Sequence, residues 1–302
     1  MTSLVREPFT LLDGGLSTAL EELGERPAGL LWTAAALVDR SHVITAAHRR
    51  YVEAGADVVI TSSYQASVPG FVAAGIDAAE ARRLLASTTA VARAAGDVLV
   101  AASVGPYGAY LADGSEYRGD YVTSGAATWN DIRAFHRARL EVLVDTAPDA
   151  FAIETVPLRA EAEIVVEELR RLTDAPAWVT FSCADRLHTC GGDLLADAAA
   201  AVAGAVAAVG VNCTSPVLVG ALLHSVHDRL GEAVPLVAYP NHGATWDGDH
   251  KCWIGPAGGS ELPSLVPEWM AAGARLIGGC CGVGSEGIRA LADLRGSMTC
   301  AR

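Results

Sequence analysis

The sequence predicts an α/β fold, a single (β/α)8 barrel of the TIM type, and three observations support this prediction. Eight apolar segments of strand length alternate with helical segments along the chain. The segments 52–63 (VEAGADVVITSS) and 270–281 (MAAGARLIGGCC) repeat one plan, in which a helix stops at glycine and an aliphatic run follows. The 302 residues also suit one barrel, so we expect a single domain over residues 1–302.

The strands and helices follow in order along the chain. We expect the eight strands near residues 10–13, 57–62, 99–104, 150–155, 177–182, 208–213, 235–240 and 275–280. Helical patterns fill the intervals, for example 128–145, 159–172 and 215–230. The alternative is an open, doubly wound sheet. The count of eight strands favours the barrel, and Gly14-Gly15 lacks the G-x-G-x-x-G spacing of a dinucleotide site.

Polar side chains or cysteines stand at the ends of most predicted strands. In chain order they are Asp13, Ser62 to Tyr64, Ser103, Glu154, Asn212 with Cys213, Tyr239 with Asn241, and Cys280 with Cys281. In a (β/α)8 barrel the carboxyl ends of all strands meet on one face, where active sites lie. We therefore expect these residues, far apart in sequence, to converge there.

Composition limits the partners and the compartment. The chain has 22 basic and 35 acidic residues, a net charge of −13, which argues against binding nucleic acid and favours small-molecule substrates. The N-terminal residues MTSLVREPFT do not look like a secretory signal. The longest apolar run, 198–211, is shorter than the about 20 residues of a membrane span and is interpreted as a buried helix that runs into a strand. We expect a cytoplasmic protein with reduced cysteines and no membrane partner.

Three cysteines are expected to lie together on the barrel face. Cys213 ends the sixth predicted strand, and Cys280 and Cys281 end the eighth. Three thiolates suit Zn²⁺, and a catalytic zinc site has three protein ligands and one open position. Gly278 and Gly279 are expected to let the backbone turn so that both adjacent cysteines reach one ion. The alternatives are inert buried cysteines, a strained disulfide between neighbours, or a phosphate site at the two glycines.

Several motifs resemble those of the homocysteine S-methyltransferase family. They are GVNC (210–213), GGCCG (278–282), LLDGG (11–15), LW (31–32), ITSSYQA (60–66), SVGPYGAYLADGSEYRGDY (103–121), ET (154–155) and YPN (239–241). The resemblance covers nearly the whole chain and implies a homocysteine-binding (β/α)8 barrel with a zinc site of three cysteines. The stretch 103–121 is similar to the branch that uses S-methylmethionine or S-adenosylmethionine, and not to the branch that uses betaine.

The resemblance implies an enzyme that transfers a methyl group from a sulfonium donor to the thiolate of L-homocysteine, giving methionine. Zn²⁺ is the implied cofactor, with Cys213, Cys280 and Cys281 as ligands and catalytic centre. We expect S-methylmethionine to be preferred over S-adenosylmethionine. One alternative acceptor is selenocysteine or another thiol or selenol. An alternative of another class is a non-catalytic zinc-binding or thiol-sensing barrel.

The resemblance also implies substrate-binding residues. Asp13 and Glu154 are expected to hold the ammonium group of homocysteine, although a helix-capping role is the alternative for Asp13. Thr155 of the ET motif belongs to the same set. The N–H groups around Gly14 and Gly15 are expected to receive the carboxylate. The remaining candidates are Trp32 and Tyr64 near the reacting centre, and Tyr107, Tyr110 and Glu116 either around the cationic donor or in ordinary loop packing.

The segment FSCADRLHTC departs from the family pattern. It places Cys183 and Cys190 after the fifth strand with His188 between them. This spacing matches no common zinc motif, so we expect structural or incidental roles for these three residues. The same holds for Cys252 and Cys300.

Overall fold

The computed structural model describes residues 4–25, 31–247, 252–254 and 261–300. Its main sheet has eight strands in the order β1-β10-β7-β6-β5-β4-β3-β2, and every neighbouring pair is parallel. The strands are β1 (Thr10–Leu11), β2 (Val58–Ile60), β3 (Leu99–Val104), β4 (Ala150–Val156), β5 (Ala177–Phe181), β6 (Ala208–Asn212), β7 (Leu236–Tyr239) and β10 (Ala274–Ile277). They coincide with the eight predicted segments to within a few residues.

The sheet closes on itself between its first and last strands. Leu12 forms a parallel bridge with Val58, and the Asp57 N–H donates to the Leu11 carbonyl at 2.7 Å. These contacts join the edge of β1 to the edge of β2, so no edge of the sheet is left open at this end. The predicted barrel is confirmed, and the open doubly wound sheet is excluded.

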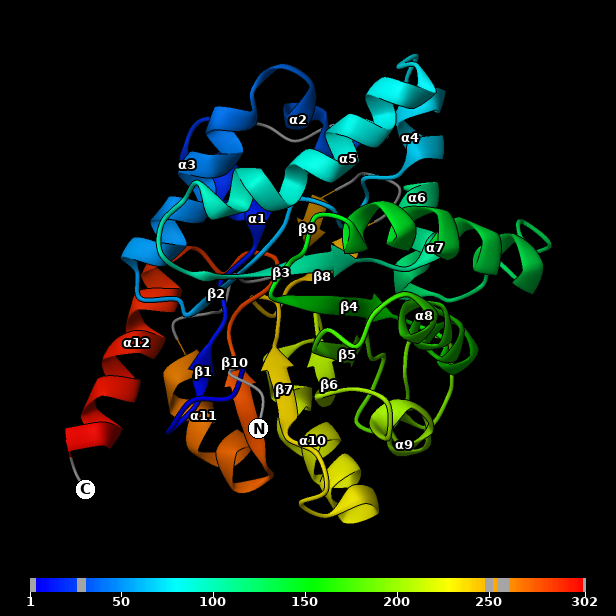
Figure 1. The fold of residues 1–302 in the computed structure, drawn as a ribbon. Helices are drawn as coiled ribbons and strands as arrows, with labels where there is room; N and C mark the ends of the chain where they lie inside the picture. The colour runs from blue at the N-terminus through cyan, green and yellow to red at the C-terminus, as the bar shows by residue number, and fades with distance from the viewer. Residues whose placement is uncertain (1–3, 26–30, 248–251, 255–260, 301–302) are drawn as a thin grey trace.

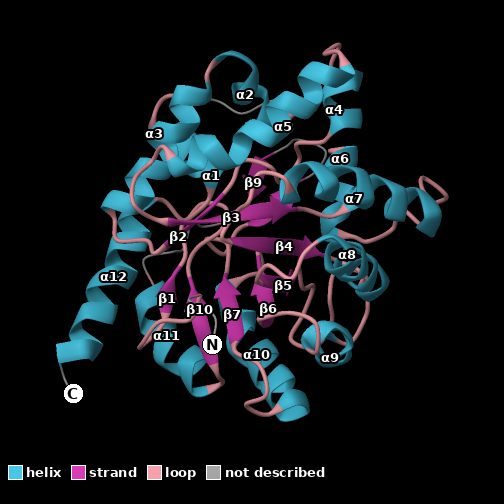
Figure 2. Ribbon diagram, viewed as in Figure 1, coloured by secondary structure: helices cyan, strands magenta, loops and turns pink. Residues whose placement is uncertain are grey.

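Helices surround the strands, as Figures 1 and 2 show. The α-helices are α1 (Leu16–Glu22), α2 (Ala36–Asp39), α3 (Ser41–Glu53), α4 (Val68–Ala73), α5 (Ala78–Arg93), α6 (Tyr107–Leu111), α7 (Trp129–Val144), α8 (Arg159–Leu172), α9 (Leu195–Ala203), α10 (Pro216–Leu230), α11 (Leu262–Ala271) and α12 (Ser285–Cys300), with short 3₁₀ helices η1 (Trp32–Ala35) and η2 (Ser115–Tyr117). The predicted helix 159–172 has the bounds of α8. Helix α7 begins where Thr128 and Asp131 form a capping box, which explains its predicted start.

The barrel core has two layers. Aliphatic side chains on the outer face of the strands pack against the helices, in the large buried cluster that includes Val59, Val179 and Val211. The barrel interior holds a second cluster, in which alanines such as Ala101 and Ala152 leave room for the fully buried Trp178. Because the interior is filled by side chains, the space for a ligand lies at the end of the barrel.

One described element has no counterpart in the sequence prediction. The strands β8 (Thr245–Asp247) and β9 (Cys252–Ile254) pair antiparallel between β7 and α11. They lie outside the barrel sheet, and each is only three residues long. Such short segments carry no helical or strand periodicity that distinguishes them from loop.

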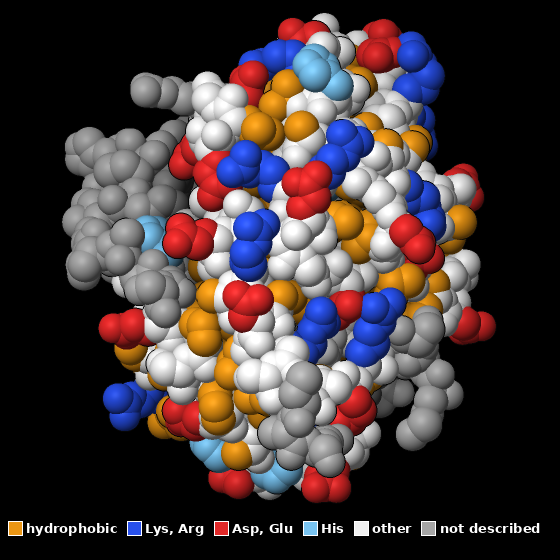
Figure 3. Space-filling view, turned by 90° about the vertical axis from the view of Figure 1, so that its left-hand side faces the viewer, with side chains coloured by type: hydrophobic (Ala, Val, Ile, Leu, Met, Phe, Trp, Pro, Cys, Tyr) orange, Lys and Arg blue, Asp and Glu red, His pale blue; other side chains and the backbone are white. Residues whose placement is uncertain are grey.

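The outer surface mixes both charges. On the face seen in Figure 3, acidic and basic side chains are interspersed, with small apolar areas between them. Within the described residues, no helix has the length and apolar character needed to cross a membrane.

Candidate active site and metal centre

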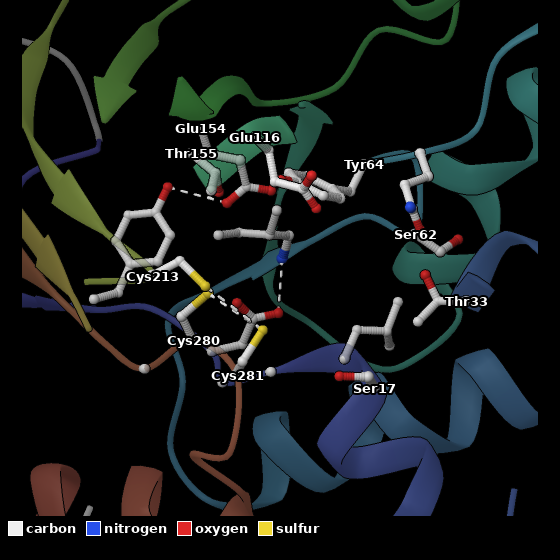
Figure 4. A pocket seen from close by; sticks show the side chains of 18 of the residues that line it. Ser17, Thr33, Ser62, Tyr64, Glu116, Glu154, Thr155, Cys213, Cys280 and Cys281 are labelled. Carbon is white, nitrogen blue, oxygen red and sulfur yellow. Dashed lines mark hydrogen bonds between the residues drawn. The ribbon is translucent and has the colours of Figure 1, made fainter. Parts of the chain in front are cut away.

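A cavity opens at the carboxyl ends of the barrel strands. Nine of the ten predicted site residues line it: Asp13, Gly14, Gly15, Tyr64, Glu154, Thr155, Cys213, Cys280 and Cys281. The tenth is Trp32, whose side chain lies outside the described part of the structure. In Figure 4 the three cysteines lie below Glu154 and Thr155, while Ser62, Thr33 and Ser17 lie across the cavity from them.

The cysteine sulfurs come together from two strands. Cys213 follows β6, and Cys280 and Cys281 follow β10. The Sγ of Cys281 is 3.6 Å from that of Cys213 and 4.0 Å from that of Cys280. Sulfurs bound to one tetrahedral Zn²⁺ at about 2.3 Å are about 3.8 Å apart, so these two separations are close to those expected for such a site. Within the described residues, these cysteines form the one group of three or more His, Cys, Asp or Glu side chains that are close enough to hold a metal ion.

Two residues that line the cavity, one cysteine and one threonine, have an unusual backbone conformation. Cys213 has a φ of 47° and Thr155 a φ of 60°, in the left-handed region that non-glycine residues rarely adopt. The buried Asn212 side chain supports Thr155: its Oδ1 accepts from the Thr155 N–H at 2.7 Å, and its Nδ2 donates to Thr155 Oγ1 at 2.8 Å. The same amide nitrogen lies 3.9 Å from Cys280 Sγ. Asn212 therefore joins the ends of β4, β6 and β10.

The turn that carries Cys280 and Cys281 corrects one expectation. Gly282, with a φ of 78°, supplies the left-handed conformation of this turn, which Gly278 and Gly279 were expected to provide. Gly278 and Gly279 are required for space instead. A Cβ on Gly278 would lie 2.7 Å from Leu12 Cβ, and one on Gly279 would lie 2.3 Å from a methyl group of Val283.

Two buried carboxylates face the cavity near the sulfurs. Asp13 Oδ2 accepts from the Ile60 N–H at 2.8 Å, which joins the end of β1 to β2. Glu154 accepts from the Ser103 hydroxyl, and from the Tyr239 hydroxyl at 3.1 Å. Burial raises the pKa of Asp13 and raises that of Glu154 to about 7. Neither carboxylate forms an ion pair among the described residues, so a bound cation would stabilise both.

The structure also corrects the expectation for Gly15. Its N–H donates to the Val283 carbonyl at 3.1 Å and is therefore not available to a substrate carboxylate. A Cβ on Gly14 would lie 2.3 Å from the same carbonyl oxygen, and a Cβ on Gly15 would lie 2.8 Å from the Cys280 carbonyl oxygen. The glycine pair thus allows the chain after β1 to pack directly on the turn that carries the cysteines.

Tyr64 is held in place by a buried cation behind the cavity wall. The Arg139 guanidinium of α7 donates to the carbonyls of Ser63, Tyr64 and Gly105 at 2.9, 3.1 and 2.8 Å. These carbonyls belong to the loops that follow β2 and β3. Burial lowers the pKa of Arg139 to about 10, so the guanidinium keeps its charge at neutral pH. Arg139 was not predicted from the sequence, because its position within a helix gives no sign of the loops that it contacts.

The three residues considered for the surroundings of the cationic methyl donor separate into two groups. Tyr107 and Tyr110 pack edge-to-face on each other, with ring centroids 5.3 Å apart, and both contact Phe135 of α7. They are not among the residues that line the cavity. Of the two expected roles for these tyrosines, the structure therefore supports ordinary loop packing. Glu116, in contrast, lines the cavity with its side chain almost completely buried, and burial raises its pKa to about 7.

The remaining cysteines lie apart from this centre. Cys183 is buried, Cys190 is partly buried, and the partly exposed His188 pairs through Nδ1 with Asp185 at 3.0 Å. Within the described residues, these three side chains do not come together as a metal-binding group. The side chains of Cys252 and Cys300 lie outside the described residues.

Two further cavity residues were not singled out as site residues. The Tyr117 hydroxyl lies 3.1 Å from Cys213 Sγ, and the Tyr239 hydroxyl contacts Glu154. Tyr117 lies within the motif stretch 103–121, and Tyr239 ends a predicted strand. The sequence thus placed both residues near the site but gave no indication of their contacts.

Comparison with known proteins gives a consistent result. A family model described as homocysteine S-methyltransferase matches residues 10–295. Homocysteine S-methyltransferase 1 of Zea mays is 40% identical over 305 residues, which cover 94% of this chain and 93% of the relative. The homocysteine S-methyltransferase of Escherichia coli is 42% identical, with 95% and 96% covered. The crystal structure of the homocysteine methyltransferase MmuM from E. coli in its metallated form has a TM-score of 0.83 at 40% identity, and the match covers 95% of this chain and 96% of that chain.

Proposed function

The chain belongs to the homocysteine S-methyltransferase family, and from this premise we propose how it transfers a methyl group to homocysteine to give methionine. We propose that Cys213, Cys280 and Cys281 hold a zinc ion, and that the methyl donor is a sulfonium compound, with S-methylmethionine preferred over S-adenosylmethionine. The observation that carries the proposal is the spacing of the three sulfurs, 3.6 and 4.0 Å for two of the three pairs, on the wall of a cavity.

The cysteines and their surroundings suit a catalytic metal. A Zn²⁺ ion held by these three cysteines would supply a positive charge that lowers the pKa of a substrate thiol. The three thiolates would partly neutralise that charge, which would leave the substrate sulfur nucleophilic. Asn212 and Tyr117 contact two of the three sulfurs and so fix their direction.

The two carboxylates near the sulfurs are suited to the ammonium group of homocysteine. Asp13 and Glu154 are both more than nine-tenths buried, and the repulsion between them helps raise the pKa of Asp13. The described residues that line the cavity include no Lys, Arg or His. An ammonium group would therefore supply the positive charge that this part of the cavity lacks.

The transfer needs no general acid. The electron pair of the homocysteine sulfur forms a bond to the methyl carbon, while the carbon–sulfur bond of the sulfonium breaks. The leaving group is a neutral thioether, and the proton of the homocysteine thiol passes to solvent. With S-methylmethionine as donor, both products are methionine. What the protein contributes is the alignment of the two sulfurs and the exclusion of water, and alignment alone lowers a barrier by several kcal/mol.

The preference for S-methylmethionine rests on the cavity wall and on the motif that forms it. Ala112, Gly114, Glu116 and Tyr117 of the stretch 103–121 line the cavity, and this stretch resembles enzymes that use sulfonium donors. A nucleoside group would need space and polar partners beyond the sulfonium centre. A betaine donor suits an aromatic cage, but the stretch 103–121 does not resemble the branch that uses betaine.

A methyl-transfer assay with zinc-loaded protein tests the proposal. Homocysteine is supplied with S-methylmethionine, S-adenosylmethionine or betaine, and kcat/KM is measured for each. We expect the highest value for S-methylmethionine and little or no transfer from betaine. A higher value for S-adenosylmethionine would reverse the order of the donors, and efficient use of betaine would contradict the sulfonium assignment.

A further inference from the structure

Four buried polar side-chain atoms of residues that line the cavity lack a hydrogen-bond partner among the described residues: the hydroxyl groups of Ser62 and Tyr64, and two oxygens that can only accept. These two acceptors are Glu116 Oε2 and Gln65 Oε1. Both residues line the cavity, and only 8% of Glu116 is exposed. A buried polar atom left without a partner costs roughly 1–3 kcal/mol, so two on one wall indicate a place for a ligand.

The surrounding structure fixes both acceptors. Gln65 Nε2 donates to the Ala109 carbonyl at 3.0 Å, which leaves Oε1 as the free end of the amide. The Glu116 carbonyl accepts from Ser182 Oγ at 2.9 Å, and its backbone packs so closely on Gly108 that a Cβ there would lie 2.6 Å from the Glu116 nitrogen. Gly108 and Ala109 are neighbours in α6, so one short helix positions both acceptors.

The chemistry of the two atoms selects their ligand. A carboxylate oxygen and an amide oxygen only accept hydrogen bonds. A sulfonium group has no N–H or O–H to offer, whereas an ammonium group has three N–H donors and the charge that a carboxylate stabilises. No cationic side chain lines the cavity in the described part of the chain, so the protein does not supply this group itself.

The number of ammonium groups in the two substrates indicates that these acceptors bind the methyl donor. Under the proposed function, Asp13 and Glu154 hold the ammonium group of homocysteine, and S-methylmethionine brings a second one. We propose that Glu116 and Gln65 bind the ammonium group of the amino-acid methyl donor. This inference rests on the proposed function and adds the residues that select the donor. The ammonium charge does not change during methyl transfer. Loss of the contact with this group therefore raises the KM of the donor and leaves kcat unchanged.

The test compares two donors that differ only in the amino group. Zinc-loaded wild type and Glu116→Gln are assayed at pH 8 with saturating homocysteine, using S-methylmethionine or its des-amino analogue 4-(dimethylsulfonio)butanoate. We expect wild type to prefer S-methylmethionine. The substitution should raise the KM of S-methylmethionine about tenfold to a hundredfold, as for the loss of a charged hydrogen bond, and should change the KM of the analogue less than about threefold.

Two further variants keep the test decisive. Asp113→Asn removes an exposed charge from the same loop, retains an acceptor for the Ser115 N–H, and should leave both KM values unchanged. Gln65→Met removes the second acceptor and should raise the KM of S-methylmethionine several-fold; it replaces Glu116→Gln as the test if that variant does not fold.

Different results would separate the two claims. Equal loss with both donors, a raised KM for homocysteine, or loss of zinc in Glu116→Gln would overturn the ammonium assignment while methyl transfer itself remained. Absence of transfer from S-methylmethionine in wild type would instead contradict the proposed function.

Discussion

At the scale of single residues, the site contains residues with unfavourable backbone conformations and buried carboxyl groups. Cys213 and Thr155 adopt left-handed backbone conformations, and such residues cost about 1–3 kcal/mol each. The carboxyl groups of Asp13, Glu154 and Glu116 are buried without a cationic partner among the described residues that line the cavity. Strain and unpaired charge in one cavity are typical of a binding site, where the ligand supplies what the free protein lacks.

The raised pKa of Glu154 predicts a pH dependence of amino-acid binding. In the free enzyme this carboxyl is ionised above about pH 7, and only the ionised form attracts an ammonium group. Binding is therefore lost as the pH falls below 7. The product methionine is a suitable probe because it has no thiol to titrate, and its Kd, measured by calorimetry, should increase about tenfold or more between pH 8 and pH 5.5.

The matched variant is Glu154→Gln. At pH 8 its Kd for methionine should be about tenfold or more above that of wild type, and this Kd should change less with pH. Its zinc content should stay that of wild type. A wild-type Kd that is flat over this range, or an unchanged slope in the variant, would show that Glu154 does not hold the ammonium group.

At the scale of elements, a buried carboxylate anchors the segment that forms the donor side of the cavity. Glu161 of α8 accepts from the Tyr107 N–H at 2.6 Å, from His136 Nε2 at 2.8 Å and from the Tyr121 hydroxyl. Burial lowers the pKa of His136, so the ring is neutral at pH 7. These bonds attach both ends of the stretch from Tyr107 to Tyr121 to α7 and α8, and the stretch carries Glu116 and Tyr117.

Replacing Glu161 by Gln tests this anchor. An amide offers one acceptor oxygen in place of two, so at least one buried donor loses its partner. We expect the free energy of unfolding in urea to fall by about 1–3 kcal/mol, and proteolysis within 107–121 to become faster. Glu163→Gln, which alters an exposed ion pair with Arg159 on the same helix, should cost less than about 0.5 kcal/mol. Equal stability of the two variants would contradict the anchoring role.

The elements themselves could be predicted from the sequence, because each has a local signal. Helix α8 has an apolar stripe, and Thr128 with Asp131 marks the start of α7. The contacts that tune the site could not be predicted. Tyr117 contacts Cys213 from the short 3₁₀ helix η2, and Gln65 is oriented by a carbonyl 44 residues away. Such contacts depend on tertiary packing, for which a single sequence carries no period or spacing.

At the scale of the whole molecule, the barrel is closed by a seam that one side chain reinforces. Asp57 accepts from the Leu11 N–H at 2.8 Å, pairs with Arg6 at 2.7 Å, and pairs with Arg295 of the C-terminal helix. It therefore links the N-terminal segment, the first two strands and α12. The eight-strand closure follows from the sequence pattern, but this reinforcement does not, because Asp57 lies in an ordinary helix-to-strand loop.

Asp57→Ala should lower the free energy of unfolding by about 2–3 kcal/mol, since a backbone N–H at the seam loses its acceptor and two arginines lose an ion-pair partner. Thermal and urea unfolding measure the effect. Asp197→Ala, which removes an exposed pair with Arg229 at 3.5 Å, is the control and should change stability by less than about 0.5 kcal/mol. If Asp57→Ala were as stable as Asp197→Ala, the strand pairing alone would be enough to close the barrel.

The proposed metal centre depends on the order of the strands in the barrel, because β6 and β10, which its cysteines follow, both pair with β7. The most direct test measures zinc per chain and the rate of methyl transfer from S-methylmethionine to homocysteine on the same preparations of wild type, Cys213→Ser and Cys190→Ser. We predict about one zinc per chain in wild type and Cys190→Ser, with comparable rates, and loss of both zinc and activity in Cys213→Ser. A folded Cys213→Ser variant that retains full zinc and full rate would contradict the assignment of the three cysteines as the metal centre.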